Sequence, residues 1–398
     1  LAYAIGGLRV GGWWWYFPLT FALKTPLPLL LVLSLSLASV LTQRALRRRA
    51  VLPLTFAAVY LVVAIVRGPN IGYRHLLPLH PTLALSIAIG WFAHRRAHPE
   101  QPDDPVALAR HGRWRNVRAY ETAALAILGL WYVVGTLTNF PNEIAYFNAV
   151  VGNGKNKHRY LISSNLDWGQ MTKQLGSYLE AHTAADILIA YSHSAPYPLP
   201  SDGHLPPHPD AAGDYAPFHP APGLYAIGTT SLHIPTACCG MGLDSYAYFR
   251  NADPVASLGD AILVYETREE DIPRWLVQCG TEKLPLNQEA IATGFPDSGI
   301  GRQIALDCTQ AWIYPDAGAT PGVYALAETE DEPILDPDAF LASHLASARL
   351  TYHQRAGFIL APFSLYELNG IIPVPTRSLA GPADAEVPPR KVIGDREA

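Results

Sequence analysis

A run of 19 residues without a formal charge, TPLPLLLVLSLSLASVLTQ (25–43), decides the fold class of this chain. Three more uncharged runs of 17, 18 and 21 residues follow, at 50–66, 76–93 and 122–142. A helix that crosses a bilayer needs about 20 apolar residues, within a range of roughly 17–25. The runs therefore predict four spanning helices, at about 25–43, 50–66, 76–93 and 119–140. Buried helices of a soluble protein are the alternative, but they rarely stay uncharged for so long.

The charge of the chain divides it into two parts. The 398 residues carry a net charge of −5, yet residues 1–139 hold 14 Lys and Arg against 4 Asp and Glu. Residues 140–398 hold 15 Lys and Arg against 30 Asp and Glu. The net charges of the two parts are thus +10 and −15. We interpret this as a basic membrane region, 1–142, followed by an acidic, solvated region large enough to have its own core.

The positive charges predict the orientation of the helices. Arginine is concentrated in the segments 43–49 and 94–118, whereas the segment 67–75 carries only two arginines. Lys and Arg accumulate in cytoplasmic loops, and aromatic residues gather at the membrane interface. We therefore expect the two Arg-rich segments inside, and the Trp-rich segment 13–16, the segment 67–75 and everything after about residue 140 outside. This describes a multi-pass protein with an extracytoplasmic C-terminal domain.

The part after the helices has a mixed α/β pattern. The stretch 158–163 is predicted as a strand, 168–182 as a helix with Met171, Leu175, Tyr178 and Leu179 on one face, and 186–191 as a second strand. Strand, helix and strand in succession indicate a βαβ unit. We therefore predict an α/β domain over 143–370. The remaining tail, 371–398, is rich in Pro, Ala and charge and is predicted to be disordered.

Short sequence echoes raise the hypothesis of two related lobes. Further strands are expected at 223–229, 254–258 and 261–266. The echoes are GLYAI (223–227) with GVYAL (322–326), and AILVYE (261–266) with APFSLYE (361–367). They suggest lobes at 143–266 and 267–370. Any β-rich domain produces similar short echoes, so an unrelated pair of segments is the alternative.

Two cations next to the predicted spans, Lys24 and Arg74, are expected at the outer face. A planar guanidinium pairs with two phosphate oxygens at once, and Asn70, Tyr73 and His75 can add hydrogen bonds. Together these residues predict a site for a lipid phosphate. A side chain that only anchors a helix end by reaching toward the interface is the other interpretation of each cation.

The segment SNLDWGQ (164–170) allows two interpretations. As a polar loop after a strand it lies where α/β sheets bind ligands, so Trp168 can stack on a sugar while Asn165, Asp167 and Gln170 bind hydroxyls. As a helix start, Asp167 caps the helix and Gln170 occupies the third position of a capping box. The two are compatible, because a cap leaves Asn165 and Trp168 available.

The cysteines and histidines predict a disulfide and no metal site. Of Cys238, Cys239, Cys279 and Cys308, the pair Cys279 and Cys308 is the preferred bridge in an oxidising compartment. The adjacent Cys238 and Cys239 would bridge only with strain, so we expect one of them to pair elsewhere or to stay free. No C-x-x-C spacing occurs. The histidines of the Pro-rich loop at 194–222 and its border match no standard metal spacing, so we expect a solvated loop; they are His193, His204, His208 and His219.

Four motifs carry a resemblance to a known family. The motifs are GWWWYFP (12–18) with KTPLP (24–28), NIGYRHLLP (70–78), NEIAYFN (142–148) and SNLDWGQ (164–170). In order and spacing they resemble bacterial family-39-type glycosyltransferases, which are polytopic GT-C membrane enzymes related to protein mannosyltransferases and to the lipid A aminoarabinose transferase. The resemblance covers roughly 1–270 and does not extend to the region beyond it.

The resemblance implies transfer of a sugar from a polyprenyl-phosphate donor to a glycan, lipid or protein acceptor outside the bacterial inner membrane. Lys24 and Arg74, with their neighbours, would then hold the donor phosphate, and the 164–170 loop would contact the sugar or the acceptor. Such enzymes have a catalytic Asp in an early outer loop, often near a divalent metal. No residue here matches that motif. Met171 also departs from the family, which usually has an acidic residue there.

We therefore expect the chain to be the C-terminal part of a membrane glycosyltransferase whose catalytic Asp lies before Leu1. The chain starts with Leu and without a signal-peptide pattern, which favours a missing N-terminal part. No cofactor is expected in this chain, and no nucleic-acid signature occurs. The alternative is a non-catalytic, membrane-anchored protein that binds carbohydrate or assists envelope assembly.

Overall fold

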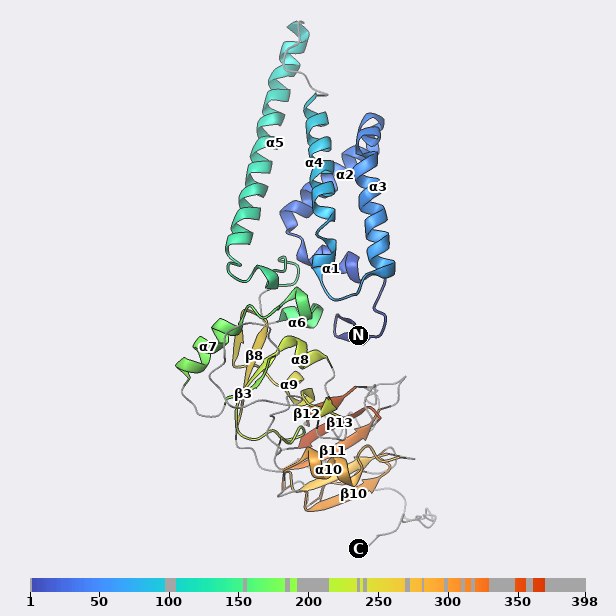
Figure 1. Ribbon diagram of the computed structural model, residues 1–398, viewed down its shortest axis with the longest axis vertical. Coiled ribbons are helices and arrows are strands. Elements are labelled where there is room, and N and C mark those ends of the chain that lie inside the picture. Colours follow the sequence, from blue (N-terminus) through green and yellow to red (C-terminus); the bar gives the residue numbers. More distant parts are fainter. Residues whose placement is uncertain are drawn as a thin grey trace, which may run out of the picture.

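The computed structural model combines long helices with a sheet-rich α/β part (Figure 1). It describes residues 2–96, 105–152, 156–182, 187–191, 215–234, 237–238, 242–268, 273–280, 283–296, 300–308, 312–315, 319–328, 348–355 and 361–368. The predicted disordered tail, 371–398, lies outside these residues, as do His193, His204, His208 and Cys239.

The helices occupy one end of the molecule (Figure 1). They are α1 (Tyr16–Lys24), α2 (Leu27–Thr42), α3 (Arg44–Arg67), α4 (Leu79–Arg96) and α5 (Pro105–Leu137), with the short 3-10 turn η1 (Tyr73–Leu76) before α4. By length and composition, Leu46–Arg67 and Ala119–Leu137 could each cross a membrane. The bent pair α1 and α2 raises the number to three if it counts as one span. The predicted span at 76–93 coincides with α4, whose apolar part, Leu79–Trp91, is shorter.

A sharp bend separates α1 from α2. The two helix axes differ by 115° across a break at Thr25 and Pro26. Proline has no N–H to donate within a helix and disfavours helical geometry in the residue before it. Thr25 is accordingly extended, and Pro28 is accommodated in the first turn of α2. The predicted span at 25–43 is thus the second arm of a broken helix.

The helices expose apolar side chains on their outer surface. On α3, Leu52, Val62 and Val66 are each more than half exposed, and on α5 Leu130 and Leu137 are 65% and 67% exposed. Soluble proteins rarely leave such continuous apolar surfaces facing water. Helices α2, α3 and α4 pack against each other, and Ser36 on α2 donates a hydrogen bond to the Ser86 carbonyl on α4. The exposed stripes therefore fit a lipid environment.

The ends of the helices separate two kinds of segment (Figure 1). The junction of α2 with α3, where Arg44 to Arg49 lie, and the end of α4 are at the end far from the sheets. The Trp-rich segment, η1 and the residues after α5 are at the end next to the sheets. The Arg-rich junction of α2 with α3 and the Trp-rich segment thus lie at opposite ends of the helices, and the side of a membrane that each would face stays a prediction.

Two larger sheets form the core of the described α/β part. The proximal sheet, next to the helices, has the order β3-β4-β8-β7. The distal sheet has the order β10-β9-β11-β13-β12. Their strands are β3 (Ile187–Ala190), β4 (Gly223–Gly228), β7 (Ala256–Leu258), β8 (Ile262–Thr267), β9 (Trp275–Cys279), β10 (Arg302–Leu306), β11 (Gly322–Ala327), β12 (Arg349–Gln354) and β13 (Phe363–Leu368).

Smaller elements surround the sheets. They are the hairpin β1 (Ala2–Ala4) and β2 (Gly7–Arg9), the pair β5 (Ala237–Cys238) and β6 (Leu243–Asp244), the helices α6 (Lys157–Tyr160), α7 (Thr172–Ala181), α8 (Thr229–His233), α9 (Ala247–Arg250) and α10 (Gln288–Gly294), and the turns η2 (Glu143–Ala145) and η4 (Ser163–Asn165). Cys279 and Cys308, the predicted pair, form a disulfide with a Cα–Cα distance of 5.2 Å.

The prediction of a strand at 158–163 is wrong. These residues form α6 and the start of η4, so the predicted βαβ unit begins without its first strand. Leu161 is fully buried in the same cluster as Tyr16 and Phe17 of α1, and Ser163 has a positive φ of 59°. Ser and Asn side chains compete with regular backbone pairing and favour turns. The predicted helix is present as α7, and Met171, Leu175 and Leu179 pack on the proximal sheet.

Candidate functional site

The structure brings the two polar motifs of the sequence together at one junction. Ser164 Oγ donates a hydrogen bond of 2.7 Å to the Ile71 carbonyl, and the Tyr73 N–H donates one of 2.9 Å to Asn165 Oδ1. Gly72 allows this approach, because a Cβ there would lie 2.1 Å from Ser164 Oγ. The segments 70–76 and 163–170, predicted as separate sites, therefore form one surface between the helices and the proximal sheet.

Asn165 joins the elements of this junction rather than facing a ligand. The residue is 1% exposed, and its side-chain nitrogen donates to Tyr16 Oη at 3.0 Å and to the Ile162 carbonyl at 3.1 Å. With the bond from Tyr73, both polar atoms of the amide are satisfied. An amide this buried cannot reach a sugar hydroxyl without losing these bonds. The expected sugar contact is thus replaced by a structural role.

Lys24 is also turned inward. Its Nζ donates to the carbonyls of Ile144 and Asn165, both at 2.6 Å, and lies 4.5 Å from the ring centroid of Phe147. Only 7% of the residue is exposed. An ammonium has three donors, so two of them are used by carbonyls of segments that follow α5. Lys24 therefore links α1 to the junction through hydrogen bonds, and it is not the surface cation expected beside Arg74.

Asn70 and Tyr73 hold neighbouring loops in place. The Asn70 side chain donates a hydrogen bond of 2.9 Å to the Trp13 carbonyl, which fixes the Trp-rich segment. The Tyr73 hydroxyl lies 2.9 Å from Thr25 Oγ1 and 2.7 Å from His80 Nε2. Both side chains therefore point into the protein, and neither presents a polar atom beside Arg74.

Arg74 and Trp168 form a pair at the junction, in which Trp168 is exposed and Arg74 is half-buried. The Arg74 guanidinium carbon lies 4.4 Å from the centroid of the Trp168 ring, and Trp168 is 67% exposed. Among the described residues, no carboxylate pairs with Arg74 and no hydrogen bond occupies its N–H groups. A guanidinium on an aromatic face keeps its N–H edge free for an anion. The pair therefore offers a cation and an aromatic surface at one point.

His75 is adjacent to this pair but differs in character. Burial, and next the charge of Arg74, lower the pKa of His75 below its ordinary value. Its ring meets Phe17 edge-on at 6.4 Å, and its Nε2 has no hydrogen-bond partner among the described residues. At neutral pH the ring is therefore uncharged, and the positive charge of this surface comes from Arg74.

The loop after η4 is fastened by its own side chains. The Gly169 N–H donates to Asp167 Oδ1 at 3.0 Å, and the Trp168 N–H donates to Gln170 Oε1 at 2.6 Å. Burial raises the pKa of Asp167, although a hydrogen bond from Tyr191 opposes the shift. The predicted capping box is wrong, because α7 begins at Thr172 with Met171 in the capping position. Asp167 and Gln170 instead shape the turn that presents Trp168.

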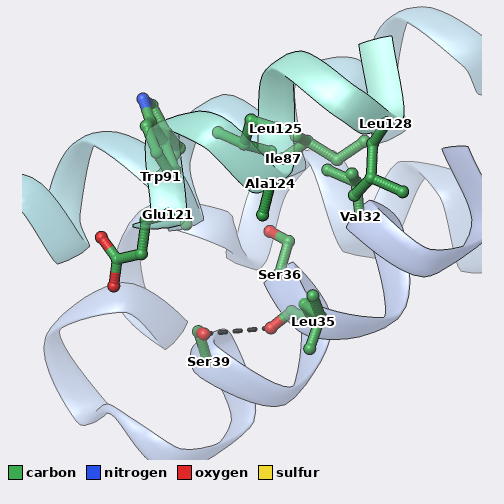
Figure 2. Close-up of a pocket in the computed structure, with 11 residues that line it drawn as sticks. Val32, Leu35, Ser36, Ser39, Ile87, Trp91, Glu121, Ala124, Leu125 and Leu128 are labelled. Atoms are coloured by element: carbon green, nitrogen blue, oxygen red, sulfur yellow. Dashed lines mark hydrogen bonds between the residues drawn. The ribbon is translucent and has the colours of Figure 1, made fainter. Parts of the chain in front are cut away.

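An apolar cavity of about 350 Å³ lies between α2, α4 and α5. Figure 2 shows Val32 and Leu128 on one side of it and Trp91 with Glu121 on the other. The polar atoms that line it come from Ser36, Ser39 and Glu121, and the other lining side chains are apolar or aromatic. A cavity of this composition between exposed apolar helices fits a hydrocarbon chain better than a polar ligand.

A polar cleft that no sequence motif indicates lies elsewhere in the α/β part, where Arg159, Arg250, Arg355 and His233 meet. Their segments are separated by up to about 200 residues in the chain, so no local motif could indicate them. Within the described residues, no group of three His, Cys, Asp or Glu could hold a metal ion.

Comparisons of the chain with models of protein families, with curated proteins and with solved structures gave no match.

Proposed function

We propose that this chain belongs to a membrane glycosyltransferase that uses a sugar linked to a polyprenyl phosphate, and that Arg74 and Trp168 bind the donor. The observation that carries the proposal is the half-buried Arg74 guanidinium, which has no ion-pair partner among the described residues and stacks on an exposed indole at the end of the helices next to the α/β part. The motifs that resemble the family-39-type enzymes contribute both residues.

Arg74 would bind the phosphate of the donor. In sugar transfer from such a donor the lipid phosphate is the leaving group, and its negative charge grows as the glycosidic bond breaks. A guanidinium placed at this group stabilises the developing charge, and its two parallel N–H bonds also orient the phosphate. No described carboxylate neutralises Arg74, so its charge is available for this purpose.

Trp168 would contact the sugar. One face of the indole is against Arg74, and two thirds of the residue surface is exposed, so apolar ring surface stays open. The turn made by Asp167 and Gln170 holds the indole at this position. Aromatic rings with an apolar face and a polar edge suit ligands such as sugars, which have both kinds of surface.

The lipid chain would run along the helices. From Leu79 to Trp91 the helix α4 rises about 18 Å, at 1.5 Å per residue. A chain of several isoprene units that starts at Arg74 could reach the apolar cavity between α2, α4 and α5 (Figure 2). The proposal includes four membrane spans, with the Arg-rich ends in the cytoplasm and the α/β part outside the bacterial inner membrane.

A binding experiment tests this proposal. The full chain in lipid nanodiscs is titrated with a radiolabelled polyprenyl-phosphate sugar, and the same titration is done with the polyprenyl phosphate alone. Arg74→Gln should weaken binding of both lipids by about tenfold or more, because a charge-assisted bond is lost. Trp168→Ala should weaken binding of the sugar-bearing lipid and leave the bare phosphate lipid nearly unchanged.

Two matched controls are present at the same end of the helices. Arg67, an exposed arginine at the end of α3, and Trp14, 72% exposed, serve as Arg67→Gln and Trp14→Ala. Both should bind like the unaltered chain. If Arg74→Gln binds the donor as well as Arg67→Gln does, Arg74 is only a helix anchor and the proposal is wrong. Donor binding without sugar transfer to any acceptor by the complete protein would favour the carbohydrate-binding alternative.

A further inference from the structure

A second polar cleft lies away from the junction, where the two sheets approach each other. Its volume is about 760 Å³. It is bordered by the N-terminal hairpin, by α6, by the residues around α8 and α9, by β8 of the proximal sheet and by the end of β12 in the distal sheet. Sites for small ligands typically measure roughly 300–1,000 Å³. The cleft is therefore large enough for a small molecule.

Three arginines, Arg159, Arg250 and Arg355, line this cleft. Arg250 is held in place, because it forms an ion pair through both its terminal nitrogens with the buried Asp244 and donates to the Leu232 carbonyl at 2.8 Å. Its charge is thus largely neutralised by Asp244. The cation that closes the other side of the cleft, Arg355, comes from the distal sheet.

Arg355 lacks such a partner. Its Nη1 is buried and has no hydrogen-bond partner among the described residues. Burial, and next the charge of Arg250, lower the pKa of Arg355. A buried guanidinium nitrogen without an acceptor is costly, and two guanidiniums near each other add repulsion. Arg159 is exposed and likewise forms no ion pair with a described carboxylate.

His233 provides an independent sign of an absent ligand. It is 6% exposed, and its Nδ1 has no partner among the described residues, although its Nε2 lies 2.7 Å from His158 Nδ1. Its ring also stacks near Tyr3, at a centroid distance of 4.8 Å. A buried polar atom normally has a hydrogen-bond partner. A buried polar atom that lines a cleft and has no such partner indicates that a ligand atom completes the hydrogen bond.

We propose that this cleft binds the oxyanion group, phosphate or carboxylate, of a small ligand, between Arg159, Arg355 and His233. Among the described residues that line the cleft, Asp253 is the one carboxylate, and it is exposed. Asp244, which pairs with Arg250, lies outside the lining. The cleft therefore keeps a net positive charge when His233 is neutral. Guanidinium groups bind both oxyanions through paired N–H bonds. The site shares no residue with the Arg74–Trp168 pair and does not depend on the proposed function.

The test measures the binding of inorganic phosphate and of glucuronate to a chain in which Arg74, the cation of the junction, is replaced. The full chain carrying Arg74→Gln is purified in detergent at low salt, and binding is followed by line broadening in phosphorus and proton NMR. Glucose serves as the neutral probe. Phosphate or glucuronate should bind and glucose should not. The anion that binds more tightly shows whether the cleft prefers a phosphate or a carboxylate. Adding Arg355→Gln should weaken anion binding by about tenfold.

Two further variants keep the test decisive. Arg159→Gln changes an exposed side chain, so it should fold normally and also weaken anion binding. Arg268→Gln is the matched control, because that side chain is 81% exposed and pairs with Glu266 outside the cleft. It should bind like its parent. Absence of binding by either anion, or equal binding by the Arg159, Arg355 and Arg268 variants, would overturn the proposal.

Discussion

The proximal and distal sheets have the same architecture but different surroundings. In each, the first two strands are parallel and the next two are antiparallel additions, in the orders β3-β4-β8-β7 and β9-β11-β13-β12. Even the register agrees. Tyr225 pairs with Tyr265 in the proximal sheet, and Tyr324 pairs with Tyr366 in the distal sheet. The echoed segments of the sequence are the paired central strands.

The difference lies in what covers the equivalent faces. In the distal sheet, Trp312 stacks on Tyr324 at 4.2 Å in a cluster that also holds the Cys279–Cys308 disulfide, and the extra strand β10 extends the sheet beyond β9. In the proximal sheet the face of Tyr225 and Tyr265 packs on Phe249, and part of it borders the polar cleft. One scaffold is thus closed by apolar packing, whereas the other supports charged side chains and joins the long apolar helices.

The largest expected effect on stability comes from removing the buried side chain of Trp275 in the distal sheet. Trp275 is 1% exposed, and its indole N–H donates to the Thr320 carbonyl at 3.0 Å. Trp275→Ala should lower the free energy of unfolding of this sheet by about 3–5 kcal/mol. Hydrogen exchange should show β9 and β11 opening while β4 and β8 stay protected. Equal loss of protection in both sheets would show instead that they unfold as one unit.

The disulfide should have a somewhat smaller effect, again confined to the distal sheet. It links residues separated by 29 positions, at the ends of β9 and β10. Replacing both cysteines by alanine should destabilise the sheet by about 2–4 kcal/mol, because the unfolded chain gains freedom. Thermal unfolding of the full chain, with and without a reducing agent, measures this. A reducing agent should destabilise the unaltered chain alone; a similar shift in the variant would mean that the reagent acts elsewhere.

The smallest effect concerns the proximal side, where charge replaces apolar packing. Burial lowers the pKa of His233 to about 2, and the charges near it, on His158, Arg250, Arg355 and Arg159, act in the same direction. The folded state thus keeps His233 neutral, while the unfolded state protonates it near pH 6.5. The contribution of neutral His233 to the free energy of unfolding is therefore fully present above that pH and is lost below it. The loss between pH 7.5 and 5.5 is about 1.4 kcal/mol.

A variant isolates this contribution. His233→Gln removes the titrating group, so the loss of stability between pH 7.5 and 5.5 should shrink by about 1.4 kcal/mol even if the variant is less stable overall. His182→Gln, which changes an exposed histidine after α7 and leaves His233 in place, is the matched control. Unfolding in detergent at several pH values measures both. Identical slopes for the two variants would contradict the neutral state of His233.

Much of the fold could be predicted from local patterns. The strands β4, β7 and β8, the helix α7 and the positions of the long helices follow from apolar periodicity and from the lengths of uncharged runs. The strand predicted at 158–163 failed because Leu161 packs in one cluster with Tyr16 and Phe17 of α1, and within the described residues no strand pairs with this segment. A short apolar stretch cannot reveal which partner will cover it.

The candidate site was predicted only in part. The sequence indicated Arg74 and Trp168, but as members of two separate sites. Lys24 and Asn165 were predicted to contact ligands. Lys24 is bonded to carbonyls that lie 120 and 141 positions further along the chain. Such partners are invisible in a local motif. Residue type indicates what a side chain can do, but the folded neighbours decide whether its donors are already used.

The sequence by itself determined the apolar helices, the division of charge between them and the acidic region, and the repeated central strands, because these depend on local composition and period. Only the tertiary structure decided that Arg74 lies on Trp168, that Lys24 is enclosed, and that Arg159, Arg355 and His233 line one cleft. These arrangements depend on hydrogen-bond partners and burial supplied by distant segments, and folding alone brings those segments together.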